Sequence, residues 1–257
     1  MSALEELFAK TKAEGRAALI GYLPAGFPSV NGAIAALQAM VEGGVDAIEI
    51  GLPYSDPLLD GPTIQAAVDA ALSGGVTTED VMQTVAEVAK IGAPTLVMSY
   101  WNPIEKFGVE QFAEQLAAAG GVGAITADII PEEAGEWIAA ARAVDLDTVF
   151  LAAPTSPPER LQRVTQASRG FVYAISRTGV TGEQQSLSED ARPLVERLRG
   201  LTQVPVALGF GLSTPEQVRE AAGAADGVVV GSALVRFLEE HPEGDLGAQV
   251  RWLTSTT

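Results

Sequence analysis

The chain of 257 residues contains no cysteine and a single histidine, and these two scarcities exclude several kinds of chemistry. Without cysteine there are no disulfide bonds, no thiolate nucleophiles and no thiolate metal sites. His241 lies in the loop-like segment Glu-Glu-His-Pro-Glu-Gly, which excludes a Ser-His-Asp triad and a metal site built from several histidines. Catalysis by this chain therefore depends on other titratable groups.

Lysine is also scarce, and none of the lysines falls within a predicted strand; they are Lys10, Lys12, Lys90 and Lys106. A Schiff-base aldolase needs a buried lysine that points into its site, so that mechanism is disfavoured. Metal-dependent aldol chemistry is disfavoured too, because histidine ligands are lacking and few acids follow predicted strands. Those acids are Glu49, Asp56, Asp60 and Asp128. Metal-free, cofactor-free acid/base chemistry remains.

Positive charge and long apolar runs are the other two deficits. The formal net charge of −17 argues against nucleic acid or an anionic membrane as a partner, since both require basic patches. No apolar run reaches the roughly 18 residues that a membrane span needs. The first fifteen residues, MSALEELFAKTKAEG, have the pattern of a charged amphipathic helix rather than a signal peptide. We therefore expect a soluble, cytoplasmic protein.

Short β-branched runs alternate with longer amphipathic segments along the whole chain, which is typical of repeated strand-helix units around a parallel sheet. Eight strands are predicted, at Ala18–Leu23, Ala47–Gly51, Thr95–Ser99, Gly123–Ala127, Thr148–Ala152, Gly170–Ile175, Val204–Leu208 and Gly227–Val230. The predicted helices include Asn31–Glu42, Thr78–Ile91, Val109–Ala119, Pro131–Ala143, Pro158–Ala167, Ser188–Arg199, Pro215–Ala222 and Leu246–Leu253. This count favours a (β/α)8 TIM barrel over an open sheet. With no linker or low-complexity segment, residues 1–257 are expected to form a single domain with an added N-terminal helix.

Two acids stand in unlike settings near the second predicted strand. Glu49 lies among Ala47, Ile48 and Ile50, so a strand there would hold its carboxyl against an apolar wall and raise its pKa. Asp60 follows on a loop rich in glycine and proline and should ionise more easily. When two neighbouring acids differ in pKa in this way, one can move protons and the other can remain a fixed negative charge. The alternative is that Glu49 points to solvent.

Glycines after the last three predicted strands indicate a phosphate site. Gly211 follows the seventh strand, Gly231 and Ser232 follow the eighth, and Gly182 belongs to the sixth loop. In barrels these loops, with the N-terminus of a short extra helix, commonly bind phosphate through backbone N–H groups. No lysine or arginine adjoins these glycines, so binding would depend on amides and a helix dipole. The alternative is that they form ordinary strand-to-helix turns.

Several of these passages together resemble the tryptophan synthase alpha subunit family over nearly the whole chain. The matching passages are Glu-Ile-Gly-Leu-Pro-Tyr-Ser-Asp-Pro from residue 49, Asp-Gly-Pro-Thr-Ile-Gln from residue 60, Gly-Phe-Val-Tyr from residue 170, Ser-Arg-Thr-Gly-Val-Thr-Gly from residue 176, and the glycine segments at 209–211 and 231–233. The resemblance implies a barrel lyase that cleaves indole-3-glycerol phosphate to indole and glyceraldehyde 3-phosphate. It also implies a beta subunit as partner in an alpha2beta2 heterotetramer. Pyridoxal phosphate is then expected only in that beta subunit, with no cofactor in this chain.

The resemblance also assigns site residues. Its catalytic acids fall on Glu49 and Asp60, and its substrate contacts fall on Tyr173, Gly182, Phe210, Gly211, Gly231 and Ser232. Tyr22 and Thr181 are further candidates for substrate contact, and the alternative for Tyr22 and Tyr173 is an ordinary core role. Thr181 could contact Asp60 from a loop that closes over the site, and the alternative is that it is a turn hydroxyl. Met98, Ile125, Ala127 and Leu151 are predicted to face the barrel interior, where they would form an apolar slot for indole.

Two positions differ from the usual family sequence, and two other functions remain as alternatives. Phe27 stands where the family commonly has an aspartate, and Tyr22 often corresponds to a phenylalanine. One alternative is a catalytically silent allosteric subunit, although retention of both acids argues against it. Another is a different metal-free barrel enzyme, such as a phosphosugar isomerase or indole-glycerol-phosphate synthase. The synthase would need a strand lysine that the sequence lacks.

Overall fold

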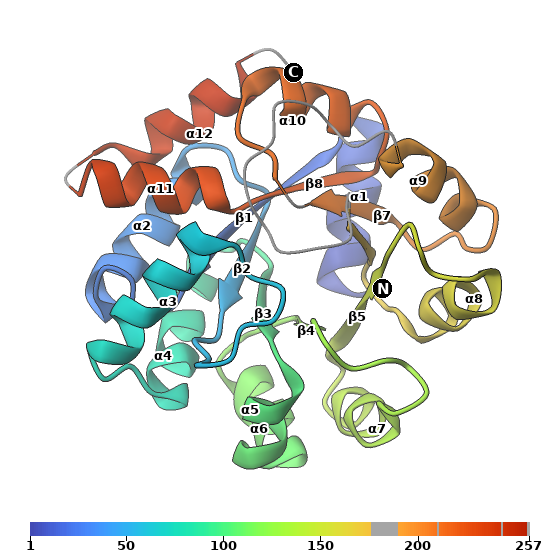
Figure 1. Ribbon diagram of the computed structural model, residues 1–257, viewed down its shortest axis with the longest axis horizontal. Coiled ribbons are helices and arrows are strands. Elements are labelled where there is room, and N and C mark those ends of the chain that lie inside the picture. Colours follow the sequence, from blue (N-terminus) through green and yellow to red (C-terminus); the bar gives the residue numbers. More distant parts are fainter. Residues whose placement is uncertain (176–189, 210, 243, 256–257) are drawn as a thin grey trace.

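The computed structural model describes residues 1–175, 190–209, 211–242 and 244–255 (Figure 1). Eight parallel strands pair in sequence order and close into a barrel, with β1 pairing β8. The strands are β1 (Ala18–Pro24), β2 (Ala47–Gly51), β3 (Thr95–Ser99), β4 (Gly123–Thr126), β5 (Asp147–Ala152), β6 (Val172–Ile175), β7 (Val206–Gly209) and β8 (Gly227–Val230). The predicted (β/α)8 barrel is confirmed.

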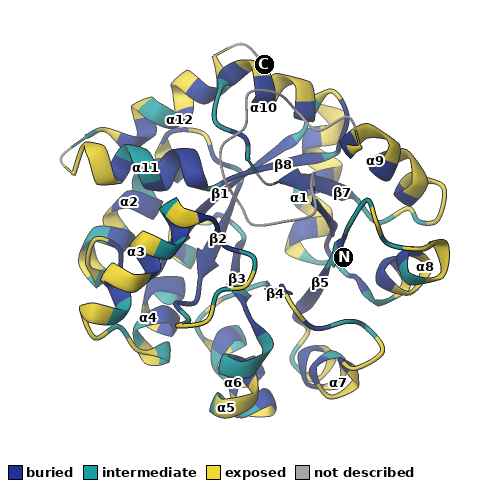
Figure 2. Cartoon of the chain, in the orientation of Figure 1, coloured by how far each residue is buried: buried dark blue, intermediate teal, exposed yellow. Residues whose placement is uncertain are grey.

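Helices surround the barrel (Figure 1). In the described residues they are α1 (Ala3–Ala13), α2 (Val30–Glu42), α3 (Pro62–Ser73), α4 (Thr78–Ala89), α5 (Trp101–Phe107), α6 (Val109–Ala118), α7 (Gly135–Ala143), α8 (Pro158–Ala167), α9 (Ala191–Arg199), α10 (Pro215–Ala222), α11 (Ser232–Glu240) and α12 (Leu246–Thr254). The outer helices carry buried residues on one side and exposed residues on the other (Figure 2). Among the described residues, no helix has the length and apolar composition needed to cross a membrane.

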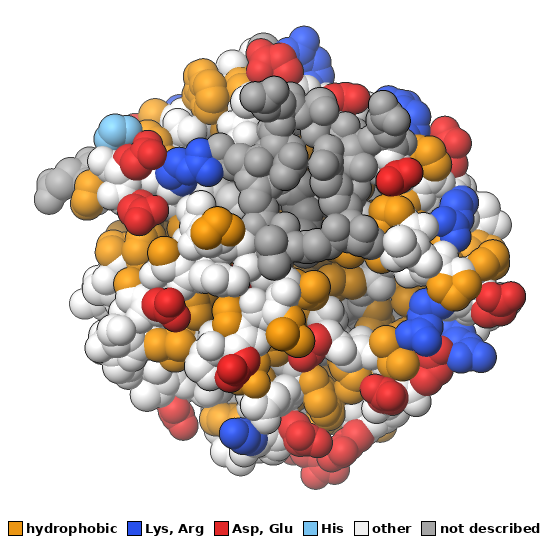
Figure 3. Space-filling model, in the orientation of Figure 1, with side chains coloured by type: hydrophobic (Ala, Val, Ile, Leu, Met, Phe, Trp, Pro, Cys, Tyr) orange, Lys and Arg blue, Asp and Glu red, His pale blue; other side chains and the backbone are white. Residues whose placement is uncertain are grey.

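The apolar core has two parts, because successive side chains of a strand point to opposite faces. Ile48 and Ile50 of β2 pack outward with the helices, whereas Ala47 belongs to a second cluster that fills the barrel. That inner cluster also contains Ile20, Leu96, Ile125 and Val149. Glu49, between two outward-facing isoleucines, must therefore point into the barrel. Side chains of Asp, Glu, Lys and Arg lie mostly around the rim of the face shown in Figure 3.

The N-terminal helix α1 closes the end of the barrel at which the strands begin. Leu4 and Phe8 are buried with the inner cluster, and the rings of Phe8 and Phe171 lie 5.7 Å apart. Ser2 caps the helix by accepting the backbone N–H of Glu5, and its hydroxyl donates to Asp147 Oδ2 at 2.6 Å. The predicted added helix is confirmed, and its position leaves the carboxyl ends of the strands for a functional site.

Most predicted elements agree with the structure to within two residues, and the exceptions have local causes. The predicted helix Pro131–Ala143 begins only at Gly135, because the Ile130 carbonyl accepts the N–H groups of Glu133 and Ala134 in a separate turn. Helices α3, α5 and α11 were not among the predicted ranges, although a short extra helix was expected beside the phosphate loops. The first two residues of the predicted helix Ser188–Arg199 lie outside the described residues, and α9 begins at Ala191.

Candidate active site at the carboxyl end of the barrel

A cavity of about 30 Å³ lies at the carboxyl ends of the strands. Its lining residues are Tyr22, Glu49, Asp60, Ile64, Met98, Tyr173, Gly211, Val229, Gly231 and Ser232. The structure therefore brings together seven of the predicted site residues: Glu49, Asp60, Tyr22, Tyr173, Gly211, Gly231 and Ser232. Thr181, Gly182 and Phe210 lie outside the described residues.

A larger groove of about 1320 Å³ lies at the opposite end of the barrel, beside α1. Its cations are largely paired: Arg16 with Asp46 at 2.6 Å, and Arg199 with Asp226 at 2.9 Å. Charges neutralised in this way give little attraction for an anion. The small cavity at the carboxyl ends, with its buried acids, is therefore the candidate active site.

Glu49 on β2 is buried inside the barrel, with only 1% of its surface exposed. Its Oε2 atom has no hydrogen-bond partner among the described residues. Burial, together with the nearby charge of Asp60, raises the pKa of Glu49 to about 8. The interpretation in which Glu49 points to solvent is wrong. A carboxyl group with a pKa near neutrality is suited to both giving and taking a proton.

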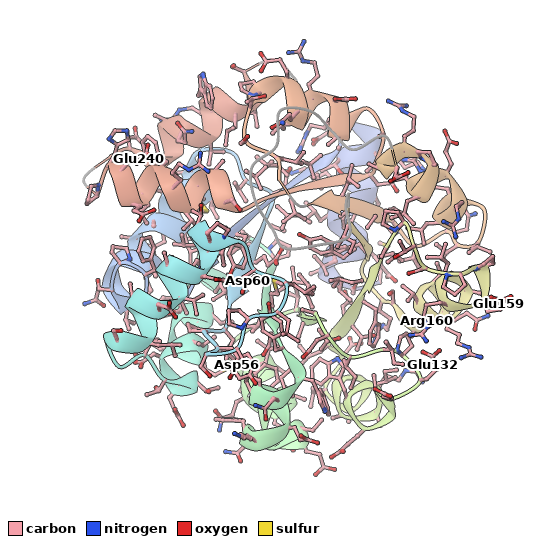
Figure 4. All side chains as sticks on the ribbon, in the orientation of Figure 1. Asp56, Asp60, Glu132, Glu159, Arg160 and Glu240 are labelled. Carbon is pink, nitrogen blue, oxygen red and sulfur yellow. The ribbon has the colours of Figure 1, made fainter. Side chains whose placement is uncertain are left out.

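Asp60 precedes α3 and is 5% exposed, so its loop position does not leave it in solvent. Burial raises the pKa of Asp60 to about 6, while a hydrogen bond from the Tyr100 hydroxyl lowers it. The predicted order of the two acids is therefore confirmed, although Asp60 departs from its ordinary pKa more than its loop suggested. Figure 4 shows Asp60 close to the centre of the barrel and Asp56 farther out.

Two tyrosines flank the acids. Tyr22 on β1 is in register with Glu49, and Tyr173 lies on β6. Their hydroxyls lie against the backbones of Gly51 and Gly209, where an added Cβ would overlap each hydroxyl. Burial raises the pKa of both phenols, and the charges of the two acids add to the effect. Both hydroxyls are therefore held in their protonated, hydrogen-bond-donating form.

Tyr100, which the sequence analysis did not assign to the site, links the loops after β2 and β3. Its hydroxyl accepts the backbone N–H of Leu59 at 3.0 Å and donates to the Asp60 carboxylate. A tyrosine directly after the predicted strand Thr95–Ser99 faces the same end of the barrel as the acids. That position was the signal that could have identified Tyr100.

The glycine loops lie beside the N-terminus of α11. Gly211 has a φ of 86°, a left-handed conformation that favours glycine, and Gly231 precedes the first residue of α11, Ser232. The Tyr22 ring packs against Gly231, since a Cβ there would lie 3.0 Å from Cδ1. Bare backbone at a helix N-terminus, together with the Ser232 hydroxyl, can bind an anion. This helix matches the short extra helix expected at a barrel phosphate site.

The remaining predicted positions lie at the same end or in the barrel core. Met98 lines the cavity, whereas Ile125 and Leu151 belong to the inner cluster. Asp128 Oδ1 accepts the backbone N–H of Trp101 at 2.6 Å, and burial raises the pKa of Asp128. Among residues 1–175, 190–209, 211–242 and 244–255, no three His, Cys, Asp or Glu side chains form a group that could hold a metal ion.

These features define a class of protein: a (β/α)8-barrel enzyme with an acid pair and anion-binding loops at the carboxyl ends of its strands. The family model described as tryptophan synthase alpha chain matches residues 8–255. The chain is 53% identical to the tryptophan synthase alpha chain of Thermobifida fusca over 252 residues, which cover 97% of this chain and 93% of that one. It is 52% identical to that of Acidothermus cellulolyticus along the whole of both chains.

A solved structure of Mycobacterium tuberculosis tryptophan synthase superposes with a TM-score of 0.94 at 49% identity, covering 99% of this chain and 97% of that one. The chain belongs to the tryptophan synthase alpha chain family, which confirms the resemblance. It is a carbon–carbon lyase of tryptophan biosynthesis that cleaves indole-3-glycerol phosphate, and its partner is the beta subunit, in the alpha2beta2 arrangement of the family. The alternative of another phosphosugar-type barrel enzyme is wrong.

Proposed function

We propose that Glu49 moves the protons and that Asp60 stabilises the developing charge in the cleavage of indole-3-glycerol phosphate. One observation carries this assignment: Glu49 is buried in the cavity with its pKa raised to about 8 beside an acid whose pKa is about 6. Near pH 7 Glu49 is then mostly protonated, while Asp60 is mostly ionised. The two acids therefore start the reaction in different protonation states.

The reaction breaks the bond between indole C3 and the first carbon of the glycerol chain. Glu49 donates its proton to C3, which makes the ring cationic. The Glu49 carboxylate then takes the proton of the adjacent side-chain hydroxyl, the C–C bond breaks as the aldehyde forms, and the bonding electron pair returns to the ring. Indole and glyceraldehyde 3-phosphate leave, and Glu49 regains its proton, so the cycle closes without an added reagent.

Asp60 acts on the positive charge that protonation of C3 creates. That charge is delocalised to the indole nitrogen, whose N–H donates to the Asp60 carboxylate. The attraction is stronger in the transition state than in the bound substrate, because the ring is neutral before protonation. Burial of Asp60 strengthens this attraction, since water does not screen it.

The substrate is held at two ends in this proposal. Tyr22, Tyr173 and Met98 contact the indole ring, together with Phe210. The phosphate binds the backbone N–H groups at Gly211 and Gly231, the Ser232 hydroxyl and the N-terminus of α11, together with Gly182. Thr181 meets Asp60 when substrate is bound. The cavity and the helix N-terminus support these roles for the described residues.

We also propose that residues 1–257 act as one domain in the cytoplasm and that this chain uses no cofactor. The closed barrel supports the first statement, and the metal-free acid/base route supports the last. Pyridoxal phosphate belongs to the beta subunit, where it supplies the chemistry that consumes indole. The product of this chain is then the substrate of its partner.

The test is cleavage of indole-3-glycerol phosphate by the Glu49→Gln variant, with and without the beta subunit. We expect loss of turnover by a factor of about 10³ or more, with substrate binding and the fold retained, because the amide cannot shuttle protons. Glu220→Gln, on the exposed surface of α10, makes the same chemical change and should retain full activity. Substantial turnover by Glu49→Gln would reassign the proton shuttle. If the unaltered chain is inactive but still activates the beta subunit, the silent allosteric subunit is the correct function.

A further inference from the structure

We propose that Tyr100 is a positioning residue that fixes the orientation of the Asp60 carboxylate through the β2 and β3 loops. The proposal rests on the proposed role of Asp60 and deepens it. Tyr100 follows β3 directly and is 4% exposed. It does not line the cavity with the acids, so it acts on the reaction through Asp60 rather than on the substrate.

The Tyr100 hydroxyl also contacts the Leu59 N–H, and that second contact determines which partner donates in its hydrogen bond to Asp60. A phenol hydroxyl has a single proton to donate. The Leu59 N–H donates to this oxygen at 3.0 Å, so the proton of Tyr100 is available for the neighbouring carboxylate. One hydroxyl thus holds both the backbone before Asp60 and its side chain.

Tyr100 is itself held by neighbours in both loops. The rings of Tyr54 and Tyr100 lie 5.5 Å apart, and Asn102 Nδ2 donates to the Tyr54 hydroxyl at 2.8 Å. The Trp101 N–H donates to Asp128 at 2.6 Å and fixes the chain after Tyr100. These contacts place the phenol before substrate arrives, so its hydrogen bond to Asp60 needs no rearrangement during the reaction.

The hydrogen bond also opposes the effect of burial on Asp60. Within the described part of the chain, three other titratable groups face Asp60, namely Glu49 from β2, Tyr22 from β1 and Tyr173 from β6. Burial disfavours the charge of Asp60, whereas the Tyr100 hydroxyl favours it by lowering the pKa. Loss of this hydroxyl would move the pKa of Asp60 toward that of Glu49 and reduce the difference between the two acids.

The experiment compares kcat/KM for indole-3-glycerol phosphate from pH 5.5 to 9 in the complex with the beta subunit, using the unaltered chain and Tyr100→Phe. The acidic limb of this pH profile, where activity falls as Asp60 is protonated, should move to higher pH in Tyr100→Phe by about one unit. That is the usual order of effect for a hydrogen bond to a charged group. The loss of activity then grows roughly fivefold between pH 8 and pH 6. A role in folding alone would lower activity by the same factor at every pH, and that result would overturn the proposal.

The matched control is Tyr54→Phe, which also removes one hydroxyl and keeps the aromatic ring. It breaks the bond from Asn102 but leaves the hydroxyl on Asp60, so its acidic limb should stay where it is. A limb that moves equally in both variants would contradict the proposal. If Tyr100→Phe does not fold, 3-fluorotyrosine at position 100 keeps the hydroxyl and donates more strongly. The acidic limb should then move to lower pH, and an unchanged limb would overturn the proposal.

Asp60→Asn separates this proposal from the function on which it rests. If that variant keeps the acidic limb, the limb does not report Asp60 and the proposed function fails. If Asp60→Asn removes the limb or the activity while Tyr100→Phe leaves the limb unmoved, only the role of Tyr100 fails.

Discussion

The carboxyl groups of Glu49 and Asp60 line one buried cavity, and the negative charge of Asp60 raises the pKa of Glu49. Glu49 projects from a strand into the barrel, whereas Asp60 comes from the loop that follows that strand. Because the groups interact, ionisation of one changes the proton affinity of the other. The two acids therefore titrate as a coupled pair.

The pH dependence of kcat/KM should be bell-shaped, with limbs near pH 6 and pH 8. Activity requires ionised Asp60, which sets the acidic limb, and protonated Glu49, which sets the basic limb. The measurement is steady-state cleavage of indole-3-glycerol phosphate across this range. A rate that keeps rising up to pH 10 would contradict the assignment of Glu49 as the initial proton donor.

Glu49→Gln should make the protein more stable than the unaltered chain at pH 8.5, although it removes activity. The folded-state pKa of Glu49 is about 8 against an ordinary value of 4.5, so its favourable contribution is present below about pH 4.5 and is lost as pH rises through 8. The uncharged amide has no such loss. At pH 8.5 the free energies of unfolding of the variant and the unaltered chain should therefore differ by an amount on the order of a few kcal/mol.

Urea unfolding of both proteins at pH 5.5 and pH 8.5 measures this difference. The advantage of Glu49→Gln should be larger at the higher pH. Glu220→Gln serves as the exposed control and should track the unaltered chain at both values. If Glu49→Gln and the unaltered chain differ in stability by the same amount at pH 5.5 and pH 8.5, the pKa of Glu49 is not raised.

Gly209→Ala should lower both stability and activity. The added methyl group would overlap the Tyr173 hydroxyl, which must then move within a filled barrel. Overpacking of this kind costs about 1–3 kcal/mol. Thermal unfolding and the KM for indole-3-glycerol phosphate measure the two effects. Gly135→Ala is the matched control, because nothing lies within 4 Å of its added Cβ, and it should unfold at or above the temperature of the unaltered chain.

Ser2→Ala should destabilise the protein more than Ser29→Ala does. Both serines cap helices, and loss of a cap alone costs about 1 kcal/mol. Ser2 also donates to buried Asp147, which would lose that bond, so a total of about 2–3 kcal/mol is expected. Urea unfolding of the two variants gives the comparison. Equal losses would show that the bond between Ser2 and Asp147 does not hold α1 against the barrel.

Local patterns in the sequence predicted most of the fold. The strands Ala47–Gly51, Thr95–Ser99 and Gly227–Val230 agree residue for residue with the structure, because short β-branched runs between turn residues leave little freedom in their bounds. The N-terminal helix followed from its amphipathic pattern. Helices α3, α5 and α11 were not predicted, and each begins without a side-chain cap.

The sequence by itself determined the barrel and drew attention to Glu49, because an acid between Ile48 and Ile50 must face inward once its neighbours face the helices. It could not reveal the burial of Asp60, the hydroxyl of Tyr100 on that carboxylate, or the bond from Ser2 to Asp147. Those features depend on residues that are far apart along the chain and meet only after the barrel closes. Alternation along a strand is a local property, whereas the pKa of a buried acid is set by all the groups that the fold brings around it.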